Sequence, residues 1–155
     1  MKLSPLALIL AAGLAAAALA GCSPGGGAAL SSGLTQRMDQ PGANLNRAEA
    51  LGIVNHFRAA SGSSQLVADA GLDATAQGLA SAYAKSGTAP KSPAGSAGMR
   101  TSAGYPNFAE TFSGWRNSPE DAAVLTTGGA SKAGIGVAYD PNSTYGVYWV
   151  LLLGN

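Results

Sequence analysis

The chain has 155 residues, with 9 Lys and Arg against 8 Asp and Glu, one histidine and one cysteine. This length suits a single domain of ordinary size. The formal net charge is only +1, and no basic patch is visible in the sequence, which argues against nucleic acid as a partner. One cysteine permits no disulfide within the chain, so the core alone must stabilise the fold.

The first 21 residues have the features of a bacterial lipoprotein signal peptide. Lys2 provides the positive charge, residues 6–19 are an apolar run, and Leu19-Ala20-Gly21-Cys22 resembles a lipobox. We therefore expect cleavage before Cys22, acylation of this cysteine and anchoring of the protein in a membrane. The alternatives are an ordinary signal peptide with a chance cysteine, or a membrane span. The apolar run is shorter than the ~20 residues that a span needs.

Residues 22–43 are rich in Gly, Ser, Ala and Pro, which is typical of a flexible tether. We expect the folded domain to occupy residues 44–155. In a cell with two membranes, Ser23 in place of aspartate after the cysteine resembles lipoproteins sorted to the outer membrane. The predicted location is therefore the cell envelope, at the outer membrane.

Two helices are predicted in the first half of this domain. Asn46 is a good N-cap with a glutamate three residues later, and the helix that follows should end near Gly62. A second helix should begin after Asp69 and end near Gly87, because apolar residues recur there at helical spacing. Residues 86–104 contain two prolines and four glycines, which predicts a loop.

Two further helices and two strands follow. One helix should begin after Asn107, again with a glutamate at the third position. The next should open with Ser118-Pro119-Glu120-Asp121, a serine cap followed by proline and two acids at the positive end of the helix dipole. Residues 135–139 and 145–153 read as strands joined by a turn at 140–143. The second strand is apolar on both faces, which predicts an α+β fold with a small antiparallel sheet between helices, a three-layer α-β-α sandwich.

Four short motifs, in this order, resemble the CAP superfamily (the cysteine-rich secretory, antigen 5 and pathogenesis-related-1 proteins), in its bacterial SCP-like branch. They are Val54-Asn55-His56-Phe57-Arg58-Ala59, the spacing of Leu66, Asp69, Leu72, Ala76 and Ala84, Gly114-Trp115-Arg116-Asn117-Ser118-Pro119, and Gly134-Ile135-Gly136-Val137 with Tyr148-Trp149-Val150. The resemblance covers residues 45 to 154. It implies the CAP fold for the whole predicted domain.

The family's cleft residues are the part of the pattern that this chain lacks. Intact members use two histidines and two acids there, and some bind a divalent metal. By the resemblance, one cleft histidine falls at Asp121, and the usual Glu-Asn pair falls at Met99-Arg100. An alternative alignment places that pair at Ala109-Glu110-Thr111. We prefer the first, because it keeps the helix after Asn107 continuous. The candidate cleft residues are thus Arg100, Glu110, Glu120 and Asp121.

These residues offer little for metal or nucleophilic chemistry. Zinc sites usually contain more than one His or Cys, and this chain has only His56 and the lipidated Cys22. We therefore expect no metal and no cofactor. Glu120-Asp121 is the one adjacent acidic pair, and its position favours a role in the helix dipole. His56 lies on the first predicted helix and no G-x-S-x-G motif occurs, so a serine nucleophile is not predicted.

The resulting hypothesis is a lipid-anchored CAP-like protein of the cell envelope. We expect a monomer that acts as a non-catalytic binding module for a lipid, a peptide or another envelope component. The alternative is a hydrolase of glycan or peptide that uses carboxylates alone, such as Glu110 and Asp121 facing each other across a groove. The lining of the largest groove distinguishes the two, because facing acids favour the enzyme and an apolar lining favours the binding protein.

Overall fold

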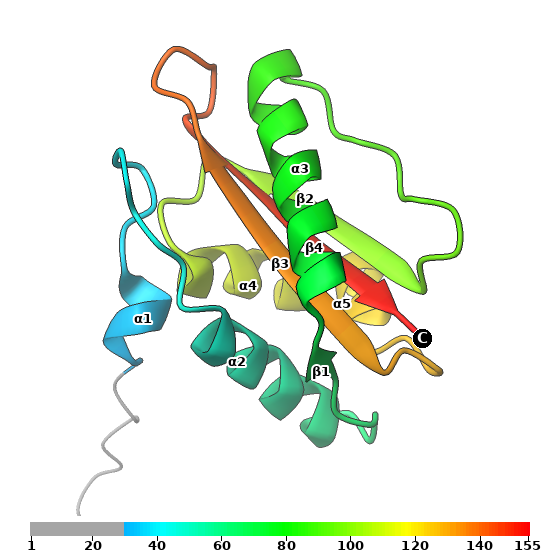
Figure 1. The fold of residues 1–155 in the computed structure, drawn as a ribbon. Helices are drawn as coiled ribbons and strands as arrows, with labels where there is room; N and C mark the ends of the chain where they lie inside the picture. Colours follow the sequence, from blue (N-terminus) through cyan, green and yellow to red (C-terminus); the bar gives the residue numbers. More distant parts are fainter. Residues whose placement is uncertain (1–29) are drawn as a thin grey trace, which may run out of the picture.

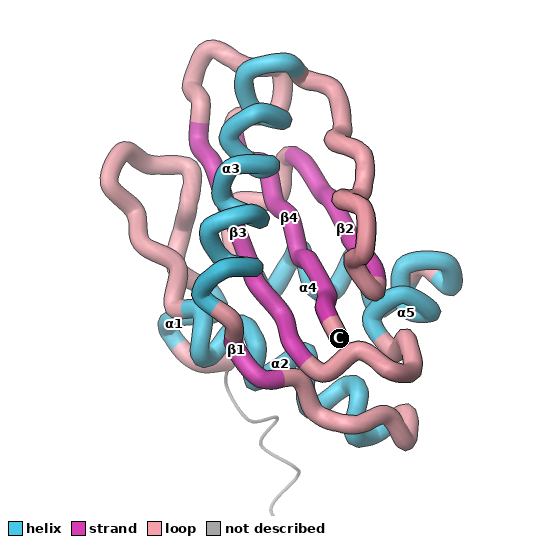
Figure 2. The backbone as a smooth tube through the Cα atoms, turned by 45° about the vertical axis from the view of Figure 1, so that its right-hand side comes forward, coloured by secondary structure: helices cyan, strands magenta, loops and turns pink. Residues whose placement is uncertain are grey.

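One sheet lies between two layers of helices in the computed structural model, which describes residues 30–155 (Figures 1 and 2). The predicted signal peptide and Cys22 lie outside the described residues. The elements are α1 (Ser32–Thr35), α2 (Arg47–Ala60), β1 (Val67–Ala68), α3 (Ala70–Ser86), β2 (Gly98–Ala103), α4 (Phe108–Asn117), α5 (Pro119–Leu125), β3 (Lys132–Tyr139) and β4 (Val147–Gly154). Helix α3 covers one face of the sheet, and α2, α4 and α5 lie on the other. The predicted three-layer α+β fold is confirmed.

The four long helices begin where the sequence predicted. Each follows a side chain that accepts a hydrogen bond from the main-chain N–H three residues later: Asn46 from Glu49, Asp69 from Leu72, Asn107 from Glu110 and Ser118 from Asp121. Helix α3 ends at Gly87, whose φ of 66° suits glycine better than other residues. No helix within residues 30–155 is long and apolar enough to cross a membrane.

Strand β4 is the centre of the sheet. The strand order is β1-β3-β4-β2, and β4 runs antiparallel to both neighbours, with Val137 opposite Trp149 and Thr101 opposite Val150. All eight residues of β4 are buried. Helices cover this strand on both sides, which explains why its sequence is apolar on both faces, as predicted. The sheet is not purely antiparallel, because the two-residue β1 pairs parallel with β3.

The loop predicted for residues 86–104 is wrong for Gly98–Ala103, which forms β2. This strand lies at the edge of the sheet, and its six residues are all half-buried, so they show no apolar alternation. Its small and polar residues contribute through main-chain pairing with β4 rather than through a hydrophobic face. Packing also favours glycine at position 98, because a Cβ there would contact the side chain of Val124.

The tether predicted for residues 22–43 is wrong for residues 30–43, which belong to the folded domain. Leu34 and Met38 are buried, with 7% and 3% of their surfaces exposed, and they join the core on the α2 and α4 side. The N–H of Met38 also donates to the carbonyl of Pro106 at 2.7 Å. Two apolar side chains are enough to fix a segment whose composition is otherwise that of a linker.

Helix α3 approaches the sheet closely at two glycines of β3. A Cβ at Gly134 would collide with the main chain of Leu72 and Asp73, and one at Gly136 with that of Ala76. Two residues of α3 that face the sheet, Ala76 and Ala80, are themselves small and fully buried. The Gly-x-Gly spacing in this strand thus serves helix-on-sheet packing.

Candidate functional site

The preferred alignment of the cleft brings Arg100 and Asp121 together. Arg100 Nη1 on β2 lies 2.5 Å from Asp121 Oδ1 on α5, and both side chains are a little under one third exposed. Helix α4 runs without a break from Phe108 to Asn117, as this alignment required. Asp121, the position at which the resemblance suggests a cleft histidine, is therefore an ion-paired carboxylate in this structure.

The other two acids do not face Asp121. Glu120 is exposed in the first turn of α5. Glu110 is exposed at the start of α4, where Asn107 Nδ2 donates to its Oε1 at 2.7 Å. The hollow beside Glu110, of about 290 Å³, is lined by Tyr105, Ser113, Gly114 and Asn117 and holds no second acid. The facing carboxylate pair that the alternative hydrolase would need is thus absent from this hollow.

Two residues of the first CAP-like motif hold the fold together. The Asn55 amide donates to the Leu66 carbonyl at 2.9 Å and accepts from the Leu66 N–H at 2.8 Å. Arg58 is only 1% exposed, and burial lowers the pKa of its guanidinium. Its nitrogens donate to the carbonyls of Ser64 at 2.8 Å and Leu125 at 2.6 Å. These side chains tie the end of α2 to segments distant in sequence.

His56, between these two residues, is exposed on α2. Within residues 30–155, no three His, Cys, Asp or Glu side chains come close enough together to hold a metal ion. The histidine instead borders a hollow between α1 and α2, of about 400 Å³. The lining consists of Leu30, Ser31, Leu34, Glu49, Gly52, Ile53 and His56.

The lining of this hollow is mainly apolar. Its one acid is Glu49, whose carboxylate accepts hydrogen bonds from Asn46 Nδ2 at 2.9 Å and Ser31 Oγ at 2.5 Å. Because no second acid faces Glu49 in the lining, the arrangement offers no carboxylate pair for glycoside hydrolysis.

The outer edge of β3 is a second feature that the sequence did not reveal. Strand β1 pairs only with Lys132 and Ala133, and the rest of this edge has no neighbouring strand. Side chains replace the missing strand at Ile135. Its N–H donates to Asp73 Oδ1 at 2.8 Å, and its carbonyl accepts from Arg47 Nε at 2.8 Å.

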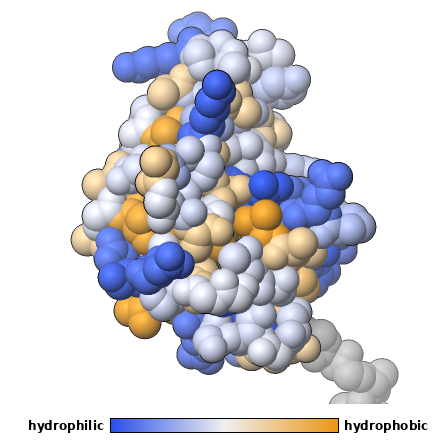
Figure 3. All heavy atoms as spheres, turned by 90° about the vertical axis from the view of Figure 1, so that its right-hand side faces the viewer, coloured by the Kyte–Doolittle hydropathy of each residue, from blue (hydrophilic) through white to orange (hydrophobic). Residues whose placement is uncertain are grey.

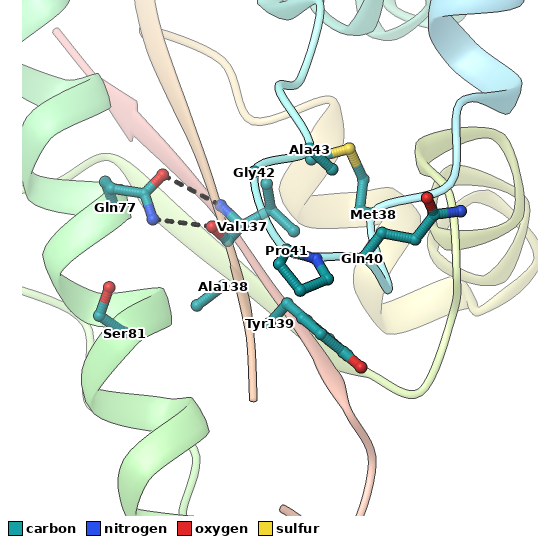
Figure 4. Close-up of a pocket in the computed structure, with 10 residues that line it drawn as sticks. All are labelled: Met38, Gln40, Pro41, Gly42, Ala43, Gln77, Ser81, Val137, Ala138 and Tyr139. Carbon is teal, nitrogen blue, oxygen red and sulfur yellow. Dashed lines mark hydrogen bonds between the residues drawn. The ribbon is translucent and has the colours of Figure 1, made fainter. Parts of the chain in front are cut away.

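Two residues further along β3, the side chain of Gln77 takes the place of a neighbouring strand in the same way. Its Nε2 donates to the Val137 carbonyl at 2.7 Å, and its Oε1 lies 3.5 Å from the Val137 N–H (Figure 4). Along an antiparallel edge, the main-chain groups of every second residue face outward. The N–H and carbonyl of Tyr139 therefore face outward, as those of Ile135 and Val137 do. Among the described residues, neither of these two Tyr139 groups has a hydrogen-bond partner.

A groove follows the edge of β3 between the loop at residues 38–43 and α3 (Figure 4). Its first part has a volume of about 300 Å³. Two adjoining parts of about 210 and 230 Å³ extend it along α3 to the turn between β3 and β4. Gln77, Ser81 and Lys85 of α3 border the groove at a spacing of four residues, so they form one polar stripe on the helix.

Comparison with known proteins agrees with the fold and the motifs. The family described as "CAP: Cysteine-rich secretory protein family" matches residues 51–153, and the chain belongs to this family. No curated protein matches the sequence.

Solved structures share the fold at low sequence identity. An outer surface protein from Borrelia burgdorferi is 16% identical with a TM-score of 0.58, over 70% of this chain and 91% of that one. An extracellular protein containing a SCP domain from Bacillus anthracis is 15% identical with a TM-score of 0.57, over 70% of this chain and 40% of that one. MpPR-1i is 19% identical with a TM-score of 0.51, over 70% of this chain and 84% of that one.

Proposed function

We propose that this protein is an exported lipoprotein, anchored at Cys22 in the cell envelope, whose CAP domain is a non-catalytic binding module. The observation that carries the proposal is the ion pair between Arg100 and Asp121, the two residues that the preferred alignment assigns to the cleft. A guanidinium stays protonated at physiological pH and cannot act as a general base. The carboxylate beside it accepts a hydrogen bond from this guanidinium, and no second acid faces it.

The proposed location rests on the lipobox and on the proteins that share this fold. One structural neighbour is described as an outer surface protein, and another as extracellular. We therefore place the protein outside the cytoplasm, at the outer membrane where the cell has one, as a monomer.

The ligand that best fits the groove along β3 is an extended peptide. The groove is bordered by the polar stripe of α3, and the Tyr139 main chain offers a donor and an acceptor at an edge without a neighbouring strand. A peptide that adds to a sheet edge gains affinity from main-chain hydrogen bonds of this kind. Lys85 and Asp140 at the far end of the groove provide charges of both signs for its termini.

Nuclear magnetic resonance titration with a pool of degenerate six-residue peptides tests this site. We expect shifts in the amide signals of Ser81, Val137 and Tyr139. Ser81→Phe should fill the groove and weaken binding by about tenfold or more. Ser113→Phe, beside the hollow near Glu110, is the matched control and should bind as the wild type does. Equal affinity of the two variants would exclude the groove as the site.

The competing hydrolase is tested at Asp121. Peptide and glycan fragments of the cell wall, incubated with the protein, should give no new products by mass spectrometry. Asp121→Asn should leave peptide binding unchanged. Turnover that is lost in a stably folded Asp121→Asn protein would mean that this carboxylate had taken over the cleft's chemistry, and that the binding-module proposal is wrong.

The anchor is tested separately by intact-mass analysis of the membrane-purified protein. A chain that begins at Cys22 should carry the mass of diacylglycerol and one further acyl chain. Cys22→Ala should leave the precursor without lipid and remove the protein from the detergent phase. A soluble wild-type protein cleaved elsewhere would disprove lipidation, and density-gradient fractionation identifies the membrane.

A further inference from the structure

The hollow between α1 and α2 has an apolar rim at the point where the described chain begins. Leu30 is 54% exposed, one of the few large hydrophobic side chains on the surface of residues 30–155. It borders the hollow together with Leu34 and Ile53. By contrast, the side of the molecule near the 86–97 loop shows only small, separate hydrophobic patches (Figure 3).

The proposed anchor lies very close to this hollow along the chain. Leu34 and Met38 are buried, so the linker between Cys22 and the folded domain is not residues 22–43 but residues 22–29. Eight peptide units span at most about 29 Å, whatever their conformation. Leu30, at the edge of the hollow, therefore lies within this distance of the proposed anchor.

The linker itself is a poor occupant for the hollow. Residues 23–29 are Ser, Pro, Gly, Gly, Gly, Ala and Ala, and they bring no large apolar side chain. A bilayer, in contrast, is an apolar phase that the anchor keeps permanently within reach. Tethering replaces a bimolecular encounter by an intramolecular one at high effective concentration, so a small apolar surface suffices for contact.

We infer that the face formed by Leu30, Ile53 and His56, above the buried Leu34, rests on the membrane and orients the domain, an inference that depends on the proposed anchor at Cys22. The turn between β3 and β4 lies at the top of the molecule in Figures 1 and 2, and the 86–97 loop runs down the side opposite α1. The groove along β3 runs toward that turn, so the bound orientation leaves it open to the surroundings.

The single histidine and single cysteine make this orientation measurable. The chain from residue 22 onward is coupled through Cys22 to a maleimide lipid in phosphatidylcholine vesicles, and diethylpyrocarbonate then modifies His56. The reference is the same protein capped with a soluble maleimide in the presence of the same vesicles. We expect His56 to react about fivefold or more slowly in the anchored protein. Acetylation of Lys91, in the 86–97 loop, should change by less than about twofold.

Two variants separate orientation from tethering. Replacing Leu30 and Ile53 together by serine should restore the His56 rate, because neither side chain is buried and the fold is kept. Inserting about twenty Gly and Ser residues after Gly27 should do the same by lowering the effective concentration. Val67→Ser is the matched control, since Val67 is 68% exposed but lies on β1. This variant should keep the protection.

Equal protection of His56 and Lys91, or no protection of either, would overturn the inference. Protection that persists in the Leu30 and Ile53 double variant would overturn it as well. The chemical anchor bypasses processing in the cell, so this outcome is independent of whether Cys22 is lipidated there. The proposed lipidation and the proposed orientation can therefore fail separately.

Discussion

Arg58 is the clearest case of a residue whose role lies in the fold. Its guanidinium is buried, and among the described residues no carboxylate lies within ion-pair distance. Main-chain carbonyls of Ser64, Leu125 and Ala130 accept its hydrogen bonds instead. A buried charge without a counter-ion is tolerated only where such donors and acceptors are well matched.

We predict that Arg58→Ala lowers the free energy of unfolding by about 3 kcal/mol or more, because it leaves several buried carbonyls without a donor. Arg58→Lys should also destabilise, since an ammonium group cannot reproduce the planar fork of the guanidinium. Arg116→Ala, at an exposed site, should change stability by less than about 0.5 kcal/mol. Urea unfolding of the three variants measures this, and an Arg58→Ala protein as stable as the control would refute it.

For single residues, the sequence predicted those interactions that join residues close together in the chain. The helix caps at Asn46, Asp69, Asn107 and Ser118 involve a partner three residues away, so the local pattern is sufficient. The ion pair of Arg100 with Asp121 needed the family alignment to suggest that the two positions meet. The bonds of Arg58 to Leu125 and Ala130 reach residues more than sixty positions away, and no local signal marks them.

Among the elements, α3 and β3 depend on the smallest side chains at their contact. We predict that Gly136→Ala lowers stability by about 2 kcal/mol or more, because its Cβ would collide with the main chain of α3, which cannot yield without moving the helix. Gly78→Ala is the control, because Gly78 lies on α3 at a position where a Cβ meets open space. It should be neutral or stabilising by up to about 1 kcal/mol. Thermal unfolding distinguishes them, and similar melting temperatures would contradict the close contact.

The α1 segment makes a second prediction at this scale. Met38→Ala should lower the free energy of unfolding by about 2 kcal/mol or more, through lost burial and the cavity that remains. Removing residues 30–43 should cost more than Met38→Ala, since it also takes away Leu34. Gln36→Ala, at an exposed position between these two residues, is the control. A protein truncated before Asn44 that is as stable as the longer chain would restore the tether interpretation.

The elements also show where pattern reading fails. Periodicity and caps together predicted the helices α2 to α4, the cap sequence alone predicted α5, and the apolar pattern predicted the strands β3 and β4, which the core buries. Strand β2 was missed since an edge strand of small residues is specified by its partner β4 rather than by its own pattern. Helix α1 was missed because two apolar residues in a Gly-rich segment form no recognisable period.

On the whole molecule, the three surface features described above lie at separate places. The ion-paired cleft position lies between β2 and α5, the groove follows the outer edge of β3, and the apolar hollow lies between α1 and α2. The first two occupy opposite edges of the sheet. A ligand in the groove would therefore not contact Arg100 or Asp121, and a membrane-facing hollow would obstruct neither of them.

The possible zinc ligands also lie on different parts of the molecule, which predicts how the protein responds to zinc. A zinc site takes three or four ligands, and structural sites usually include several His or Cys. The only imidazole here is His56, on α2 beside the apolar hollow, whereas Asp121 lies on α5 at the ion pair with Arg100. We therefore predict no micromolar zinc site in the protein without its signal peptide, with the Cys22 thiol blocked.

Calorimetric titration and thermal unfolding with zinc measure this directly. Zinc at 100 times the dissociation constant of a real site would add ~2.7 kcal/mol of stability and raise the melting temperature by several degrees. His56→Ala and Asp121→Asn locate any such effect. A rise that vanishes in His56→Ala would reveal a site built around the hollow between α1 and α2. A rise that vanishes in Asp121→Asn would show that the cleft position still binds metal, against the interpretation of Asp121 as the ion-pair partner of Arg100.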